Sequence, residues 1–88
     1  MAANNVARHS VEYLAVARDG FAVTASDSTD FTTNARYLYV GTGGNVVVVT
    51  TKGSVLTYKN VPSGGYIYME CKRVNSSNTT ATDIVAGL

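Results

Sequence analysis

Two residue types with reactive side chains occur once each in this 88-residue chain, Cys71 and His9. A single cysteine excludes an internal disulfide, and one histidine with one cysteine is too few for a zinc site of the cysteine–histidine type. A catalytic thiolate also needs a nearby histidine or helix N-terminus. Cys71 instead follows Ile67 and Met69 on the apolar side of an alternating segment. We therefore interpret Cys71 as a small buried hydrophobic residue.

The carboxylates offer two further kinds of chemistry. Asp27 and Asp30, in "DSTD", could bind calcium, but an EF-hand loop needs more oxygen ligands, a glycine at its sixth position and a terminal glutamate, and these do not follow. Short polar side chains of this kind commonly bond their own backbone in turns. A glycosidase-type pair needs two carboxylates across a cleft, and a chain this short has little room for a cleft beside its core. The sequence therefore predicts no metal, no cofactor and no enzyme activity.

The glycine-rich stretch "GTGGN", residues 41–45, could cradle a phosphate. Val46 occupies the position of the third glycine of a Rossmann fingerprint, and no Gly-Lys-Ser/Thr follows as in a P-loop. Both phosphate loops precede a helix, whereas the valine run at 46–49 favours a strand. We therefore expect the glycines here and in the next turn to supply positive-φ turn conformations between antiparallel strands. These predicted turn glycines are Gly41, Gly43, Gly44 and Gly53.

The elements that position these residues are predicted to be strands. β-Branched and aromatic residues and period-2 alternation recur between clusters of Gly, Pro, Ser, Asn and Asp. The expected strands are residues 21–24, 36–40, 46–50, 55–60, 66–74 and 83–88. The run at 46–50 is continuous rather than alternating, which indicates cover on both faces. The pattern predicts an all-β fold, a small antiparallel β-sandwich or barrel of about six short strands.

The first twenty residues differ from the rest. Their apolar residues are irregularly spaced, which fits either a short helix over 10–18 or an extended arm that docks on something else. We therefore divide the chain into an N-terminal arm, residues 1–20, and a β-domain, residues 21–88.

Composition limits the classes of partner. Only 15% of the residues are charged and the net charge is +1, with no basic cluster, which argues against nucleic-acid binding. No stretch approaches the ~20 apolar residues of a membrane span, and no secretory signal is visible. We therefore expect synthesis in the cytoplasm and no membrane association. A chain this short has a small margin of stability. With no disulfide and no zinc site, we expect association between subunits to supply additional stability.

Several sequence motifs, taken in order, resemble the spike base protein family of gene transfer agents and related tailed phages. The motifs read "AVTASDSTDF", "ARYLYVGTGGNVVVV" and "TYKNVPSGGYIYMECKRVNSSNTTATDIVAGL", and the similarity covers about residues 21–88. The matching positions are Thr24, Ser26, Asp27, Thr29, Asp30, Arg36, Leu38, Tyr39, Val40, Gly41, Gly44, Val46, Val61, Pro62, Gly64, Arg73, Val74, Thr79, Thr80, Ala81, Thr82, Ile84, Val85 and Ala86. Ala25 replaces the family's usual proline, and Gly87-Leu88 ends the chain where Leu-Tyr or similar is common.

The resemblance implies a virion protein that forms the base of head spikes or fibres on capsid vertices. Its partners would be the major capsid protein, a spike or fibre protein and further copies of itself, with a pentameric ring as the natural assembly at a fivefold vertex. The protein would be made in the cytoplasm of the host bacterium and located in the head of a phage or phage-like particle.

Two sets of residues are predicted to form contacts. The apolar residues of the arm would contact the capsid or a neighbouring subunit, and two tyrosines of the β-domain would contact another subunit or a partner. The first set is Val6, Val11, Tyr13 and Leu14, and the second is Tyr66 and Tyr68. Two alternatives remain open: a decoration protein that cements the whole capsid, for example as a trimer, or a carbohydrate-binding module for host attachment in which the two tyrosines stack on sugar rings.

Overall fold

The computed structural model describes residues 18–88. The predicted helix or arm lies outside this part, apart from its last residues, as do the four arm residues predicted to make contacts, Val6, Val11, Tyr13 and Leu14. The described chain forms seven strands: β1 (Gly20–Ala22), β2 (Tyr37–Thr42), β3 (Gly44–Thr50), β4 (Val55–Val61), β5 (Gly65–Ile67), β6 (Cys71–Val74) and β7 (Thr82–Gly87).

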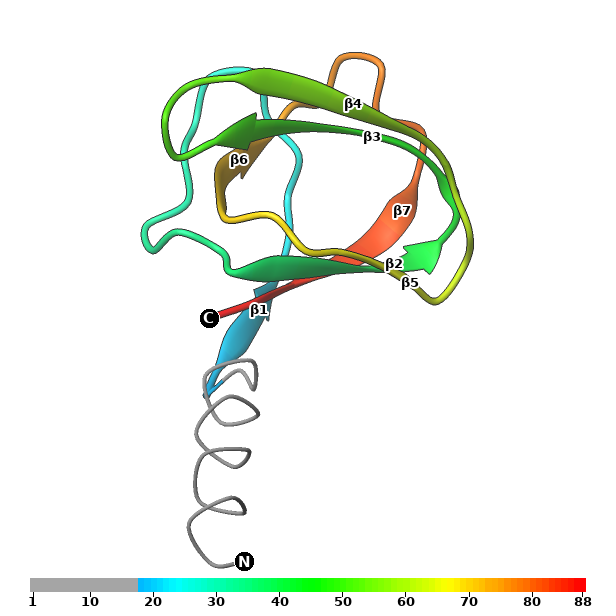
Figure 1. Ribbon diagram of the computed structural model, residues 1–88, viewed down its shortest axis with the longest axis horizontal. Helices are drawn as coiled ribbons and strands as arrows, with labels where there is room; N and C mark the ends of the chain where they lie inside the picture. The colour runs from blue at the N-terminus through cyan, green and yellow to red at the C-terminus, as the bar shows by residue number, and fades with distance from the viewer. Residues whose placement is uncertain (1–17) are drawn as a thin grey trace, which may run out of the picture.

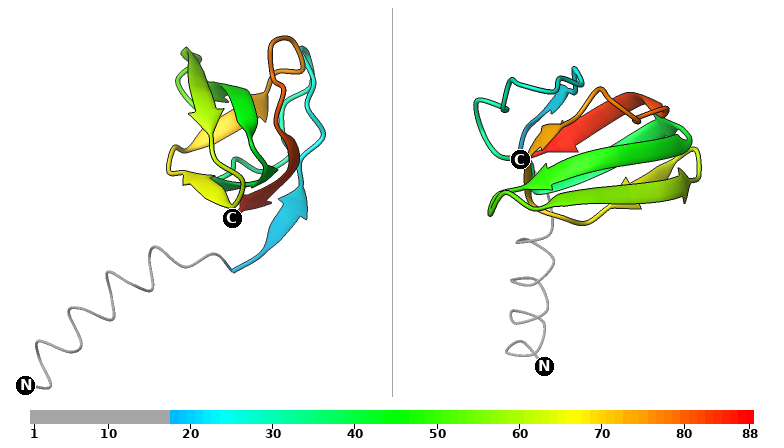
Figure 2. Two further views of the ribbon diagram at one scale, coloured as in Figure 1. Left: turned by 90° about the vertical axis from the view of Figure 1, so that its right-hand side faces the viewer. Right: turned by 90° about the horizontal axis from the view of Figure 1, so that it is seen from above.

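The strands form two antiparallel sheets that pack as a β-sandwich (Figure 1). Sheet A has the strand order β1-β7-β2-β5, and sheet B has the order β4-β3-β6. Figure 2 shows the two layers from further sides, with β3 and β4 next to each other in the right-hand view. The predicted all-β fold is confirmed, and residues 18–88 contain no helix.

The core lies between the sheets. On β2, Leu38 and Val40 are fully buried, and on β3 Val46 and Val48 are fully buried, so each strand supplies alternate side chains to one apolar layer. The whole run at 46–50 is buried, which confirms the expectation drawn from its continuous pattern. Val46 and Val48 belong to the core cluster, whereas Val47 and Val49 are buried on the opposite face of sheet B.

The glycine-rich stretch is a corner between the sheets and not a hairpin, which corrects the prediction. It joins β2 of sheet A to β3 of sheet B. Gly41 and Gly43 do not have positive φ, whereas φ is 156° at Gly44 and 94° at Gly53, which lies in the turn between β3 and β4. At Gly41 the absent side chain permits close approach, since a Cβ there would lie 2.7 Å from the Asp83 carbonyl oxygen.

The predicted strand at 66–74 is also wrong as a single element. Its first part is β5 in sheet A and its second part is β6 in sheet B, and residues 68–70 cross from one sheet to the other. Inward residues keep their period across the break: Ile67 and Cys71 are buried, and Met69 packs against the core. Alternation therefore identified the inward side chains correctly but could not reveal the change of partner strand.

Candidate interaction surface

The outer face of sheet A carries a cluster of four tyrosines, here called the tyrosine face. Its members are Tyr37 and Tyr39 on β2, Tyr66 on β5 and Tyr68 just after β5. Because side chains alternate along a strand, Tyr37 and Tyr39 point away from the core that receives Leu38. Tyr39 lies directly opposite Tyr66 in the β2–β5 register, which places the two rings on the same side of the sheet.

The rings contact one another in a continuous group. The centroids of Tyr39 and Tyr66 are 5.3 Å apart in an edge-to-face arrangement. Tyr66 and Tyr68 are stacked, with centroids 5.7 Å apart and planes 8° from parallel. The ring centroid of Tyr37 lies 5.8 Å from that of Tyr66 and 6.2 Å from that of Tyr68. Such distances lie in the range of favourable aromatic pairs, so the cluster is a preformed surface rather than a set of independent side chains.

The tyrosine face is open to solvent and continues across the sheet. Tyr68 is 78% exposed and Tyr66 is 50% exposed. Val85 on β7 is 44% exposed and lies opposite Tyr39 in the β2–β7 register, so it extends the same face. The ring of Tyr37 covers Gly87, where a Cβ would collide with it. A glycine at this position therefore lets the aromatic ring lie flat on the sheet.

An exposed aromatic face of this kind suits binding between macromolecules. Tyrosine offers a large rigid contact area at low entropic cost and a hydroxyl for hydrogen bonding, and it is enriched at protein interfaces. Tyr66 and Tyr68 were predicted to contact a partner, and the structure brings them together. Sequence reasoning missed Tyr37 and Tyr39, although the alternation within "RYLYV" could have assigned them to the face opposite Leu38.

A groove of about 670 Å³ lies between β1 and the loop that follows it. Phe21 and Phe31 meet there edge to face, with ring centroids 5.0 Å apart. Its lining combines apolar side chains with hydroxyl groups and one carboxylate: Phe21, Ala22, Thr24, Ala25, Ser26, Thr29, Asp30, Phe31, Thr32, Thr33 and Leu88. The groove carries a single ionisable side chain, that of Asp30.

Asp27 and Asp30 form structural tethers. The carboxylate of Asp27 accepts hydrogen bonds from the backbone N–H and the hydroxyl of Ser77, at 3.0 and 2.6 Å. These bonds lower the pKa of Asp27 below its ordinary value of 3.8. Asp30 accepts from the Arg73 guanidinium at 2.8 Å. Residues 18–88 contain no group of three or more Asp, Glu, His or Cys side chains placed to hold a metal ion.

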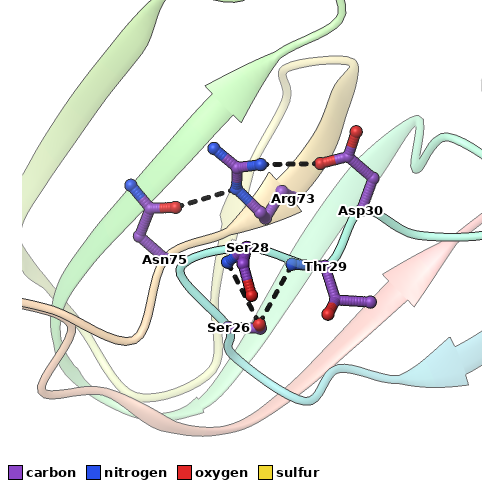
Figure 3. A network of polar contacts seen from close by, with 6 residues as sticks. All are labelled: Ser26, Ser28, Thr29, Asp30, Arg73 and Asn75. Carbon is purple, nitrogen blue, oxygen red and sulfur yellow. Dashed lines mark hydrogen bonds and ion pairs between the residues drawn. The ribbon is translucent and has the colours of Figure 1, made fainter.

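Figure 3 shows how the loop after β1 is fixed to β6. The Ser26 hydroxyl accepts from the backbone N–H groups of Ser28 and Thr29, at 3.2 and 3.1 Å, which closes a tight turn. Arg73 spans the network, since its Nη1 donates to Asp30 and its Nε donates to Asn75 Oδ1 at 3.0 Å. The exposed ion pair adds little free energy by itself, so its main effect is to fix the position of the loop.

Backbone bonds continue this attachment along β6. The N–H of Ser26 donates to Val74 O at 2.8 Å, and the N–H of Phe31 donates to Lys72 O at 2.7 Å. Ala35 and Cys71 exchange two further bonds. The loop therefore covers the edge of sheet B that β6 would otherwise leave free, which is one way in which proteins prevent uncontrolled strand pairing.

The threonines before β7 hold the start of β3. Thr79 Oγ1 accepts from the N–H of Val47 at 3.0 Å, and Thr80 Oγ1 accepts from the N–H of Asn45 at 2.9 Å. The Asn45 carbonyl in turn accepts from the N–H groups of Thr80 and Ala81. The N–H groups of Asn45 and Val47 lie beyond the end of β6, and the threonine hydroxyls accept their hydrogen bonds in place of a neighbouring strand. The matching motif residues Asp27, Asp30, Arg73, Thr79 and Thr80 all make such internal bonds.

Cys71 is fully buried. Desolvation, with a smaller contribution from the charge of Glu70, raises the pKa of its thiol to about 11. The thiol is therefore protonated at neutral pH, which agrees with its interpretation as a core residue and not as a nucleophile.

Among residues 18–88, no helix is long and apolar enough to cross a membrane.

Comparisons with known proteins relate this chain to a solved structure. No family model matches the chain, and no curated protein matches it. Among solved structures, it is similar to a chain of the capsid of a native GTA (gene transfer agent) particle, determined with C5 symmetry. The two are 35% identical with a TM-score of 0.74, and the match covers 82% of this chain and 83% of the other. The protein therefore belongs to the same family as this chain of a gene transfer agent capsid.

Proposed function

We propose that this protein is a non-enzymatic structural component of the head of a phage or phage-like particle. Within that role we assign it to the base of a spike or fibre on capsid vertices. The observation that carries the proposal is its relationship to a chain of a gene transfer agent capsid, at 35% identity over 82% of this chain. The order and spacing of the sequence motifs, which resemble those of spike base proteins, support the finer assignment.

The geometry suits a rigid building block. Its long loops are held by hydrogen bonds within a loop, between loops and to the strands, and these limit the freedom of the surface that meets other subunits. The side chains that make them are Ser26, Asp27, Asp30, Arg73, Thr79 and Thr80. The tyrosine face offers a preformed contact area. A ring needs one surface patch to meet a different patch on the next copy, with a rotation that closes. We propose a pentamer of this kind, bound to the major capsid protein below and to a spike or fibre protein above.

Cryo-electron microscopy of particles that carry the protein tests this proposal. Vertices are reconstructed separately from the rest of the shell and without imposed symmetry, and the protein is labelled by a fused tag. We expect a ring of small β-domains at vertices only. Density at all capsomer centres or junctions would instead identify a decoration protein. Particles whose heads lack the protein would overturn the proposal.

One observation favours a second candidate, which is carbohydrate binding during host attachment. The exposed Tyr68 ring, stacked on Tyr66, presents a flat aromatic surface of the type that sugar rings contact. Glycan-array binding by the intact protein tests this candidate. Binding that is lost in Tyr68→Ala and kept in Val55→Ala, an exposed apolar residue on the other sheet, would support it. No binding by the unaltered protein would remove it.

A further inference from the structure

We infer that the tyrosine face receives the N-terminal segment, residues 1–17, of a neighbouring copy of the same chain. The inference rests on the proposed function, because assembly on the capsid supplies the neighbour. It names both sides of a subunit contact: Tyr66 and Tyr68 on one copy, and the apolar residues of the segment on the next.

The exposed area of the two most open tyrosines suits the side chains of a short segment. A covered aromatic side chain buries about 150–250 Å². With Tyr68 78% exposed and Tyr66 50% exposed, the two rings offer about 200–300 Å² of contact area. A globular partner in a standard interface covers about 800 Å² on each side. The exposed parts of Tyr66 and Tyr68 therefore suit a few side chains of one segment, and a globular partner would need contact area beyond these two rings.

The first seventeen residues have the chemistry and length for this contact. They contain apolar side chains that aromatic rings can cover, and only two side chains of the Asp, Glu, Lys or Arg type, Arg8 and Glu12. The apolar set is Val6, Val11, Tyr13, Leu14 and Val16. Seventeen residues can span up to about 55–60 Å when extended, so the segment can reach an adjacent small domain.

The direction of the chain at Arg18 favours a neighbour over the same copy. The Arg18 N–H donates to Leu88 O at 3.1 Å, and the Leu88 N–H donates to Asp19 O at 2.8 Å, which extends the β1–β7 ladder beyond Gly20. Gly20 lies level with Gly87 in the register, and Gly87 lies level with Tyr37. Arg18 and Asp19 therefore lie at the end of sheet A where Tyr37 begins β2, and they continue the line of β1. To cover its own tyrosines, the segment would have to reverse directly beyond this ladder.

Photo-crosslinking on the full chain tests the inference. Position 68 is changed to the photoreactive residue benzoylphenylalanine, in place of a tyrosine that is 78% exposed. Unlabelled copies with this change are mixed with ¹⁵N-labelled unmodified copies during assembly, and crosslinked peptides are identified by mass spectrometry. We expect crosslinks from position 68 to ¹⁵N-labelled peptides within residues 1–17. The same probe at Val55, which is 59% exposed on sheet B, should not yield them.

Other results would overturn the inference. Crosslinks confined to one copy would assign the segment to its own domain, and crosslinks to the capsid or fibre protein would assign the face to that partner. Crosslinks to residues outside 1–17 would also contradict it. If cryo-electron microscopy still shows rings at vertices, only the arm contact fails and the proposed function stands.

Two full-length variants add a measurement that does not depend on crosslinking. Tyr68→Ser and Leu14→Asp alter the two sides of the contact. Because Tyr68 is 78% exposed, Tyr68→Ser should leave the fold intact, and circular dichroism checks this. Each should weaken self-association by about thirtyfold in native mass spectrometry or analytical ultracentrifugation, which corresponds to the loss of a hot-spot side chain. The double variant should lose much less than the product of the two effects, because both remove one contact. Independent, multiplicative losses would contradict a direct contact.

Discussion

The hydrogen bond from the Val47 N–H to Thr79 Oγ1 provides a quantitative test of how this sandwich is closed. Val47 is 5% exposed, and its N–H lies 3.0 Å from the threonine hydroxyl. Thr79→Val keeps the shape of the side chain but removes the acceptor. A buried donor left without a partner costs about 1–3 kcal/mol. For a domain of this size, a loss of about 2 kcal/mol lowers Tm by about 8–16 °C.

The measurement is urea unfolding at 25 °C, followed by far-UV circular dichroism and tyrosine fluorescence. Thr57→Val is the matched control, since Thr57 is exposed and lies opposite the same Val47 on β4. We expect the control to change the free energy of unfolding by no more than about 0.5 kcal/mol. Thr79→Ser retains the hydroxyl and should lose less stability than Thr79→Val. If Thr79→Val and Thr57→Val were equal within about 0.5 kcal/mol, the hydroxyl would not be the partner on which the β3 backbone depends.

Three further predictions concern the loop tether, the thiol and the core. The pKa of Asp27 is lowered in the folded state by bonds from Ser77, so the stabilisation from these bonds is complete above the ordinary pKa of 3.8 and is lost as the pH falls through the lower folded value. The stability difference between the unaltered protein and Ser77→Ala should therefore shrink below pH 3.8 in acid titrations, and a constant difference down to the end of the titration would contradict the assignment. Cys71, with a pKa of about 11, should react with a disulfide reagent at pH 8 far more slowly in the folded protein than in urea; equal rates would show that the thiol is accessible. Leu38→Ala, at a fully buried core position, should destabilise the domain by about 2–5 kcal/mol in urea unfolding, and a loss under about 1 kcal/mol would contradict its place in the core.

The hydrogen bonds of the structure change how the motif residues are understood. Sequence reasoning weighed Asp27 and Asp30 as possible calcium ligands and favoured turn formation. The structure uses both carboxylates to fasten a loop, one to Ser77 and one to Arg73. The same is true of Thr79 and Thr80, whose hydroxyls bind the backbone of β3. These motif residues therefore maintain the shape of the domain, and the tyrosine face is the better candidate for contact with other molecules.

Local chemistry determined much of the architecture from the sequence alone. A run of β-branched residues such as 46–50 resists helix and favours a strand, whatever its neighbours. The absence of a helix after "GTGGN" excluded a phosphate loop, and alternation along 66–74 identified Ile67 and Cys71 as inward residues. Each of these conclusions depends on short-range preferences that a single sequence displays directly.

Partner strands and surfaces were decided only by the tertiary structure. The corner at residues 41–45 and the break at residues 68–70 both move the chain from one sheet to the other, and the period of two continues through such a crossing without a change in pattern. Tyr37 and Tyr39 join Tyr66 and Tyr68 because β2 pairs with β5, more than twenty residues away in the chain. Strand pairing depends on which backbone edges meet after collapse, and that is a property of the whole packed domain rather than of any segment.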